Sequence, residues 1–174
     1  MYKVNRLFNV NTSCLDINYN SYIQYLQNTD LDNADRAWFY QTCSEFGFYQ
    51  TTDNNYDFYG NIIPIDWYVK QCRDVFGSAF DNSTVYSNIA YTNVLFHGQN
   101  GYHGPNTMLT YGTADPWHVL GVLSQNGPFP IMMNGTYHCA AMGEMNKTSD
   151  PPELWDVKYL IQELILCEFM DNIC

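Results

Sequence analysis

The chain has 174 residues, and its 7 basic and 18 acidic side chains give a formal net charge of −11. A phosphate backbone would repel this surface, which excludes a nucleic-acid partner held by bulk charge. Hydrophobic residues make up 46% and charged residues only 14% of the chain, which excludes intrinsic disorder. The longest apolar stretches, such as Tyr159 to Leu166, fall far short of the roughly 20 residues that cross a bilayer, so we expect no membrane span.

The cysteines and the glycosylation sequons are typical of an exported protein. Six cysteines without any Cys-x-x-Cys spacing favour disulfides over a structural zinc site. Residues 1–10 lack the apolar segment of a secretory signal, so the exported character predicts further sequence upstream. Four acceptor sequons predict N-glycosylation, and they begin at Asn11, Asn82, Asn134 and Asn146.

Two elements are predicted before residue 53. Apolar side chains recur at helical spacing between Tyr19 and Leu26, which predicts a short amphipathic helix. Residues 36–52 are dense in aromatic and β-branched types and contain Gly47. This composition predicts an extended segment or strand with a bend. A polar break follows over residues 53–61.

Two helices are predicted next. Pro64 suits a first helical turn, and Gly77 is placed to end the helix. The apolar side chains between them share one face, which places Cys72 on the buried side of a helix of about three turns. Residues 83–93 are expected to form a short helix through Val85 and Ile89.

The second half alternates strands and helices. Residues 97–107 are rich in Gly, His, Asn and Pro and are expected to form a loop. Two short apolar runs, 108–111 and 129–133, predict buried strands, with a helical segment over 116–124 between them. Asp150, Pro151 and Glu153 form a capping-box pattern before a long amphipathic helix that ends at Phe169. This alternation predicts an α/β fold with a parallel sheet and flanking helices.

Functional side chains in such sheets lie on loops after the carboxyl ends of the strands. Asp115 follows the first predicted strand and His138 follows the second. A carboxylate can fix the tautomer of an imidazole and stabilise the imidazolium, while the other ring nitrogen takes the proton of a nucleophile. In the α/β-hydrolase fold the triad runs in the order nucleophile, acid, histidine, and the last two appear here in that order.

Four segments resemble, in the same order, the C-terminal part of the lysosomal Pro-Xaa carboxypeptidase family, which includes prolyl carboxypeptidase, dipeptidyl peptidase II and the thymus-specific serine protease. The segments are Arg36–Thr51, Thr113–His118, Gly135–Cys139 and Ser149–Leu154. The resemblance implies a serine-type exopeptidase that acts on peptides and needs no cofactor. It also implies a lysosomal or secreted location.

The resemblance further assigns residues and domains. Asp115 and His138 would be the triad acid and base, and Trp117 would line the pocket for the substrate residue beside the scissile bond. A disulfide would join Cys43 and Cys72. Residues 1–34 would be the remnant of a helical cap insertion, and residues 35–174 would be the C-terminal portion of an α/β-hydrolase catalytic domain.

One departure from the family concerns the nucleophile. None of the eight serines lies in a Gly-x-Ser-x-Gly elbow, and the accompanying oxyanion-hole turn is absent from the sequence. The isolated chain is therefore expected to be inactive. Since a half-built parallel sheet leaves an apolar edge, the chain is also expected to aggregate or to need a partner, either the missing N-terminal half or a second copy.

Other functions remain open. A truncated paralogue that binds peptides or a partner without cleaving them fits the missing elbow, and a secreted glycan-binding module is a third alternative. A metal site at His97, His103 and His118 is disfavoured because their spacing matches no helical ligand pattern and acidic companions are lacking. A thiol mechanism is disfavoured because Cys139 is adjacent to His138 on an extended segment, where neighbouring side chains point to opposite sides.

Overall fold

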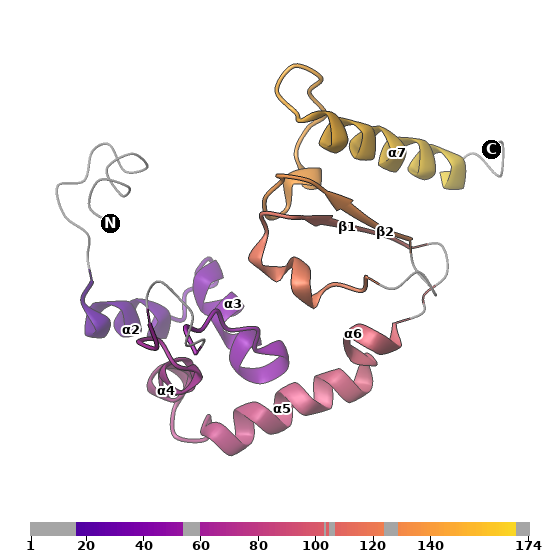
Figure 1. Ribbon diagram of the computed structural model, residues 1–174. Helices are drawn as coiled ribbons and strands as arrows, with labels where there is room; N and C mark the ends of the chain where they lie inside the picture. Colours follow the sequence, from indigo (N-terminus) through magenta and orange to yellow (C-terminus); the bar gives the residue numbers. More distant parts are fainter. Residues whose placement is uncertain (1–16, 54–59, 103, 105–106, 124–128, 170–174) are drawn as a thin grey trace. The chain divides into compact units, whose positions relative to one another are not determined.

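The computed structural model describes residues 17–53, 60–102, 104, 107–123 and 129–169 (Figure 1). The chain forms two compact units, Met1–Tyr91 and Thr92–Cys174, and the boundary falls within one helix. Asn11, Cys14, His103 and Cys174 lie outside the described residues. The predicted division at residue 34 into a cap remnant and a catalytic portion stays a prediction.

The first unit consists of helices. They are α2 (Tyr19–Gln27), α3 (Ala34–Gln41), a π-helical turn (Thr42–Phe46), α4 (Ile65–Phe76) and α5 (Asn82–Leu95), which runs across the boundary. Asparagine side chains cap the first two helices: Asn18 accepts a hydrogen bond from the Ser21 N–H, and Asn33 accepts one from the Arg36 N–H. The predicted helices around Tyr19, Cys72 and Val85 are confirmed.

The predicted extended segment over residues 36–52 is wrong. Residues 34–46 are helical, and the helical turn ends at Gly47, whose φ of 65° suits glycine. Packing explains the difference: Phe39 and Cys43, one helical turn apart, both lie in the core of the first unit. Burial of this face outweighs the modest β-propensity of the aromatic residues around it.

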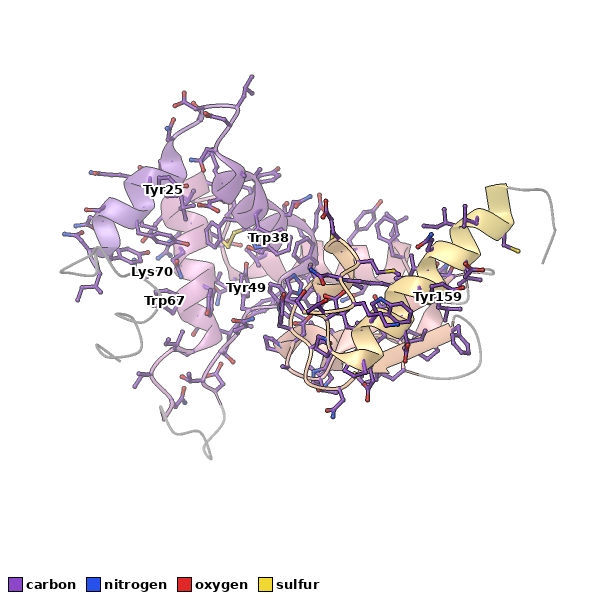
Figure 2. All side chains as sticks on the ribbon, turned by 90° about the horizontal axis from the view of Figure 1, so that it is seen from above. Tyr25, Trp38, Tyr49, Trp67, Lys70 and Tyr159 are labelled. Carbon is purple, nitrogen blue, oxygen red and sulfur yellow. A yellow bond between two sulfur atoms is a disulfide. The ribbon has the colours of Figure 1, made fainter. Side chains whose placement is uncertain are left out.

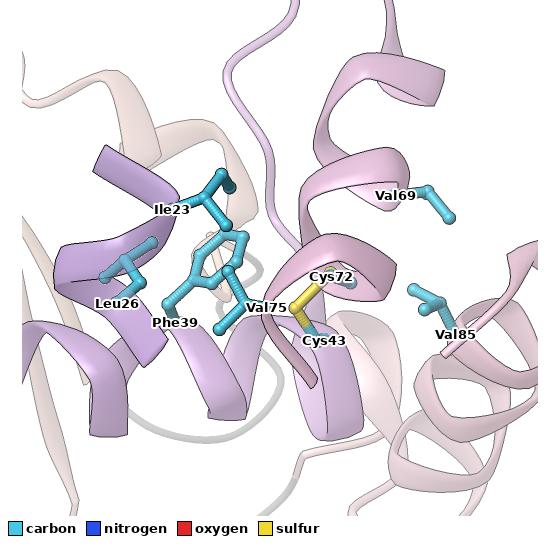
Figure 3. Packing of buried hydrophobic residues seen from close by; sticks show 8 residues of the cluster. All are labelled: Ile23, Leu26, Phe39, Cys43, Val69, Cys72, Val75 and Val85. Carbon is cyan, nitrogen blue, oxygen red and sulfur yellow. A yellow bond between two sulfur atoms is a disulfide. The ribbon is translucent and has the colours of Figure 1, made fainter. Parts of the chain in front are cut away.

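The core of the first unit surrounds a disulfide between Cys43 and Cys72, whose Cα atoms lie 5.7 Å apart (Figure 3). The pairing implied by the family resemblance is therefore present. The Tyr49 hydroxyl lies 2.9 Å from the Thr42 carbonyl oxygen and 3.2 Å from Cys72 Sγ. Tyr49 is labelled in Figure 2. Among the described residues, eight buried side chains form this core: Ile23, Leu26, Phe39, Cys43, Val69, Cys72, Val75 and Val85.

The second unit contains a parallel pair of strands, β1 (Met108–Gly112) and β2 (Phe129–Met133). The register pairs Met108 with Phe129 and Gly112 with Met133, so the carboxyl ends of the two strands lie together. Both strands are confirmed, with β1 one residue longer than predicted. The predicted helical segment between them is a 3₁₀ helix (Pro116–Leu120), and the predicted loop over 97–107 contains the short helix α6 (Gly98–Gly101).

Helix α7 (Pro152–Phe169) lies along the strands and packs against β2 (Figure 1). Leu154 and Val157 from its first turns bury against Met133 of β2 and Ala140 of a 3₁₀ turn (Ala140–Met142). The predicted apolar face is buried only over these first turns, because Leu160, Leu164 and Ile165 are exposed. No helix in the described part of the chain is long and apolar enough to cross a membrane.

The predicted capping box before α7 is wrong. The Glu153 carboxylate does not turn back to its own helix but accepts a hydrogen bond from the Asn134 N–H at 2.6 Å. The Asp150 carboxylate accepts from the Asn146 N–H at 2.9 Å and pairs with the buried Lys158 ammonium at 3.0 Å. Glu153 and Asp150 therefore connect α7 to the loops that precede it. These contacts replace the hydrogen bonds to the first turn of α7 that a capping box would form.

Candidate active site

Asp115 occupies the turn that follows β1. Its backbone N–H donates to the Gly112 carbonyl oxygen at 3.0 Å, which closes the turn at the end of the strand. Its side chain then caps the 3₁₀ helix, because Oδ1 accepts a hydrogen bond from the Trp117 N–H at 2.9 Å. The second carboxylate oxygen, Oδ2, faces the loop that follows β2.

His138 lies at the end of the loop that follows β2, and its Nδ1 lies 2.8 Å from Asp115 Oδ2. Since a carboxylate only accepts hydrogen bonds, the proton of this contact belongs to Nδ1, which leaves Nε2 as the proton acceptor. The Asp115 side chain is only 13% exposed, whereas that of His138 is 54% exposed. The carboxylate is thus covered, and the imidazole is open to a reacting group.

The ionisation of Asp115 suits a carboxylate that stabilises a positively charged imidazole. Burial raises the pKa of its carboxyl group, but the hydrogen bonds from His138 and from the Trp117 N–H outweigh burial, and the net pKa lies below the ordinary value of 3.8. Asp115 therefore carries its negative charge throughout the neutral and mildly acidic range. It can stabilise an imidazolium at His138 under all these conditions.

This shift predicts a pH-dependent stability. Because the folded-state pKa of Asp115 lies below 3.8, its contribution to folding is present above about pH 4 and is lost as the pH falls through the folded-state value. Carbon-13 NMR titration of the Asp115 carboxyl should give a pKa below 3.8 in the wild type. The His138→Ala variant should bring it back towards the ordinary value. An unchanged pKa in that variant would contradict the assigned cause.

Two aromatic side chains, Trp117 and His118, lie beside Asp115 and His138. The Trp117 ring meets the His138 ring edge to face, with centroids 4.8 Å apart and planes inclined at 72°. His118 turns its Nδ1 to the Asp115 carbonyl oxygen at 2.6 Å, so it contacts the backbone of the acid and not its carboxylate. Within the described ranges, no group of three or more His, Cys, Asp or Glu side chains could hold a metal ion.

A close approach at Gly112 sets the spacing of the two loops. A Cβ atom at this buried position would lie under 3.0 Å from both the carbonyl oxygen and the hydroxyl of Thr136. The same Thr136 carbonyl accepts a hydrogen bond from the Ala114 N–H at 2.9 Å, and the Thr136 hydroxyl donates to the Met133 carbonyl at 3.0 Å. The absence of a side chain at Gly112 thus lets the two loops touch through their backbones.

Gly112→Ala is expected to destabilise the protein by about 2 kcal/mol, because overpacking against a fixed backbone forces the loops apart. Urea unfolding followed by circular dichroism measures the loss. Gly143→Ala is the matched control, since its backbone φ is −73° and its Cβ would meet no atom closer than 3.8 Å. Equal midpoints for the two variants would contradict the close approach.

The other predicted modification sites are accessible to solvent where they are described. Asn82, Asn134 and Asn146 are exposed, and their glycosylation stays a prediction.

Cys139, directly after His138, is a free and exposed cysteine, whereas Cys167 is disulfide-bonded. The structure brings Asp115, His138 and Trp117 together, and their roles stay predictions. Sequence reasoning missed the contacts of Thr113 and Glu153 with the His138 loop, because no sequence motif signals them.

Comparison with known proteins identifies relatives for most of this chain. The profile of the family described as Serine carboxypeptidase S28 matches residues 1–161. The Caenorhabditis elegans protein named "Putative serine protease K12H4.7" is 36% identical over 137 residues, which cover 74% of this chain and 27% of the relative.

Two mammalian relatives extend the match. The thymus-specific serine protease of Mus musculus is 31% identical over 146 residues, which cover 81% of this chain and 28% of that protein. Its Homo sapiens counterpart is 31% identical over 154 residues, which cover 85% of this chain and 29% of that protein. No solved structure matches significantly. The chain spans less than a third of the length of these relatives, and it belongs to the serine carboxypeptidase S28 family.

Proposed function

We propose that this chain supplies the acid and the base of a serine-type exopeptidase, with Asp115 as the acid and His138 as the base. The observation that carries the proposal is the 2.8 Å hydrogen bond between Asp115 Oδ2 and His138 Nδ1, which leaves the second nitrogen of an exposed imidazole to act as the base. The nucleophilic serine of the proposed peptidase would lie outside these 174 residues, since none of their serines stands in a Gly-x-Ser-x-Gly elbow.

The chemistry follows from these two side chains. His138 Nε2 takes the proton of the serine hydroxyl as the oxygen attacks the scissile carbonyl, and it then returns the proton to the leaving amine. The largely covered Asp115 carboxylate keeps the proton on Nδ1 and stabilises the imidazolium that forms in between. Neither step requires a metal ion or an organic cofactor.

The proposal also gives the strands a place in a larger sheet. Strands β1 and β2 would be the late strands of an α/β-hydrolase sheet, since acid and histidine follow neighbouring parallel strands in the family's order. Helix α7 would cover one face of that sheet, and residues 1–34 would belong to a cap insertion. The earlier strands, which carry the nucleophile, would pair beside these two.

The substrate would be a peptide cleaved next to proline or a similar residue at one of its ends. Trp117 supports this choice, because its indole ring contacts the His138 imidazole and provides an apolar surface beside the base. A flat aromatic surface suits the compact, apolar proline ring. The specificity for proline rests on the family likeness and on this contact.

The location would be lysosomal or extracellular. The buried Cys43–Cys72 disulfide supports passage through an oxidising compartment, since structural disulfides persist there and are rare in the cytosol. The exposed sequons at Asn82, Asn134 and Asn146 suit the same route.

A fluorophosphonate probe applied to the native gene product tests the proposal, because the probe modifies only an activated serine. We expect a labelled product larger than the 20.2 kDa of this chain. We also expect that peptides ending in a proline-containing pair compete with the probe. A stable product of 20.2 kDa that binds such peptides but takes no label would contradict the peptidase and favour a non-catalytic peptide-binding paralogue.

A further inference from the structure

Thr113 stands between the two loops that carry the acid and the base. It is the first residue after β1, and its backbone N–H donates to the carbonyl oxygen of Met133, the last residue of β2, at 3.1 Å. The backbone of Thr113 is therefore attached to the end of the neighbouring strand. Its side chain starts from a fixed point beside the His138 loop.

The Thr113 hydroxyl forms two contacts with that loop. Oγ1 accepts a hydrogen bond from the Gly135 N–H at 2.7 Å and donates one to Asn134 Oδ1 at 3.4 Å. Gly135 has a φ of 70°, a conformation in which a glycine turns the chain sharply just before Thr136 and His138. One side chain from the acid's loop thus holds both residues that begin the base's loop.

Glu153 secures the same loop from another element. Its carboxylate accepts from the Asn134 N–H at 2.6 Å, a charge-assisted contact from the first turn of α7. The first two N–H groups of the loop are therefore bound by two different side chains, Asn134 by Glu153 and Gly135 by Thr113. The direction in which the loop leaves β2, and hence the place of His138, depends on both contacts.

We propose that Thr113 is a positioning residue that holds the His138 imidazole at hydrogen-bond distance from Asp115. A hydroxyl is needed because it must accept from one residue of the loop and donate to the next. The β-branched side chain restricts χ1, which keeps the hydroxyl aimed at the loop before the contacts form. The structural part of this inference stands on geometry alone, and its kinetic part rests on the proposed peptidase function.

The first arm of the test is proton NMR on the native gene product that contains this chain. The His138 Nδ1–H, bound to the Asp115 carboxylate, should give a downfield signal that the His138→Gln variant removes. Thr113→Val, which keeps the side-chain shape but loses the hydroxyl, should broaden or abolish this signal, whereas Thr113→Ser should retain it. Far-UV circular dichroism verifies that each variant stays folded.

Three results of this arm would overturn the proposal. They are an intact signal in Thr113→Val, an equal loss in Thr113→Ser, and the absence of the signal from the wild type. The first two would show that the hydroxyl does not hold the imidazole. The third would show that the pair itself is not formed.

The second arm measures kinetics in the native peptidase that contains this chain. Thr113→Val should lower kcat about tenfold with KM within twofold of wild type, because a displaced base slows the chemical step and not substrate binding. Thr113→Ser should stay within twofold of wild type in both. An unchanged kcat in Thr113→Val would overturn the positioning role. If the wild type itself takes no fluorophosphonate label, the proposed function fails, and the NMR arm still decides the role of Thr113.

Discussion

If this chain belongs to the proposed peptidase, Asp115→Asn is expected to lower its kcat about 10⁴-fold, or about 5.5 kcal/mol of transition-state stabilisation. The expected cause is the tautomer of His138. In the variant, the amide oxygen can still accept from the Trp117 N–H, which turns the amide nitrogen towards His138 Nδ1. Since that nitrogen donates, Nδ1 must accept, and the imidazole proton moves to Nε2, which can then no longer accept the proton of the serine hydroxyl.

A chimera makes this measurement possible without the rest of the native protein. This chain would replace the matched 28% of the Mus musculus thymus-specific serine protease, and fluorophosphonate labelling and peptide hydrolysis would be followed together. Asp156→Asn is the matched control, because Asp156 is an exposed aspartate on α7 in the same unit and should leave kcat within twofold. A loss of less than tenfold in Asp115→Asn would contradict the role of the acid.

Removal of the Cys43–Cys72 disulfide is expected to lower the free energy of unfolding of the first unit by about 3.5 kcal/mol. The bond joins residues 29 positions apart, and a cross-link of that span removes this much loop-closure entropy from the unfolded chain. Both sulfurs are also fully buried in the core. The double variant Cys43→Ala/Cys72→Ala tests the expectation without leaving an unpaired thiol.

Urea unfolding of the native gene product that contains this chain, followed by circular dichroism, measures the change. Cys139→Ser is the control, since Cys139 is free and exposed and its replacement should leave the midpoint unchanged. A loss below about 1 kcal/mol in the double variant would show that the helices of the first unit retain their packing, or that the unfolded chain is already compact, without the cross-link.

The strands and the contact between Asp115 and His138 could be predicted from sequence because both depend on local signals. Short apolar runs bounded by turns identify β1 and β2, and the rule that parallel strands end together places Asp115 near His138. Residues 34–46 could not be predicted in the same way. Their aromatic residues favour a strand locally, and only the distant partners in the core and Cys72 make the helix more stable.

The contacts that hold the loops could not be predicted for a related reason. Glu153 stands at a position where a local capping box is the common outcome, but its partner is Asn134, 19 residues earlier in the chain. Thr113 is of a residue type that is common in turns, and only the pairing of the two strand ends brings its hydroxyl to Gly135. Such contacts arise from tertiary structure and leave no periodic pattern in the sequence.

The paired register of β1 and β2 makes chain length a constraint on this region, in addition to the identity of the residues that form its contacts. Gly112 lies opposite Met133, and Asp115 and His138 meet after three and five further residues. The exposed side chains of Ala114 and Tyr137 between these points can vary, whereas Thr113 and Gly135 are held by the contacts described above. An inserted or deleted residue in either loop would instead rotate or withdraw one partner, so insertions and deletions should be far rarer than replacements among natural variants of these two loops.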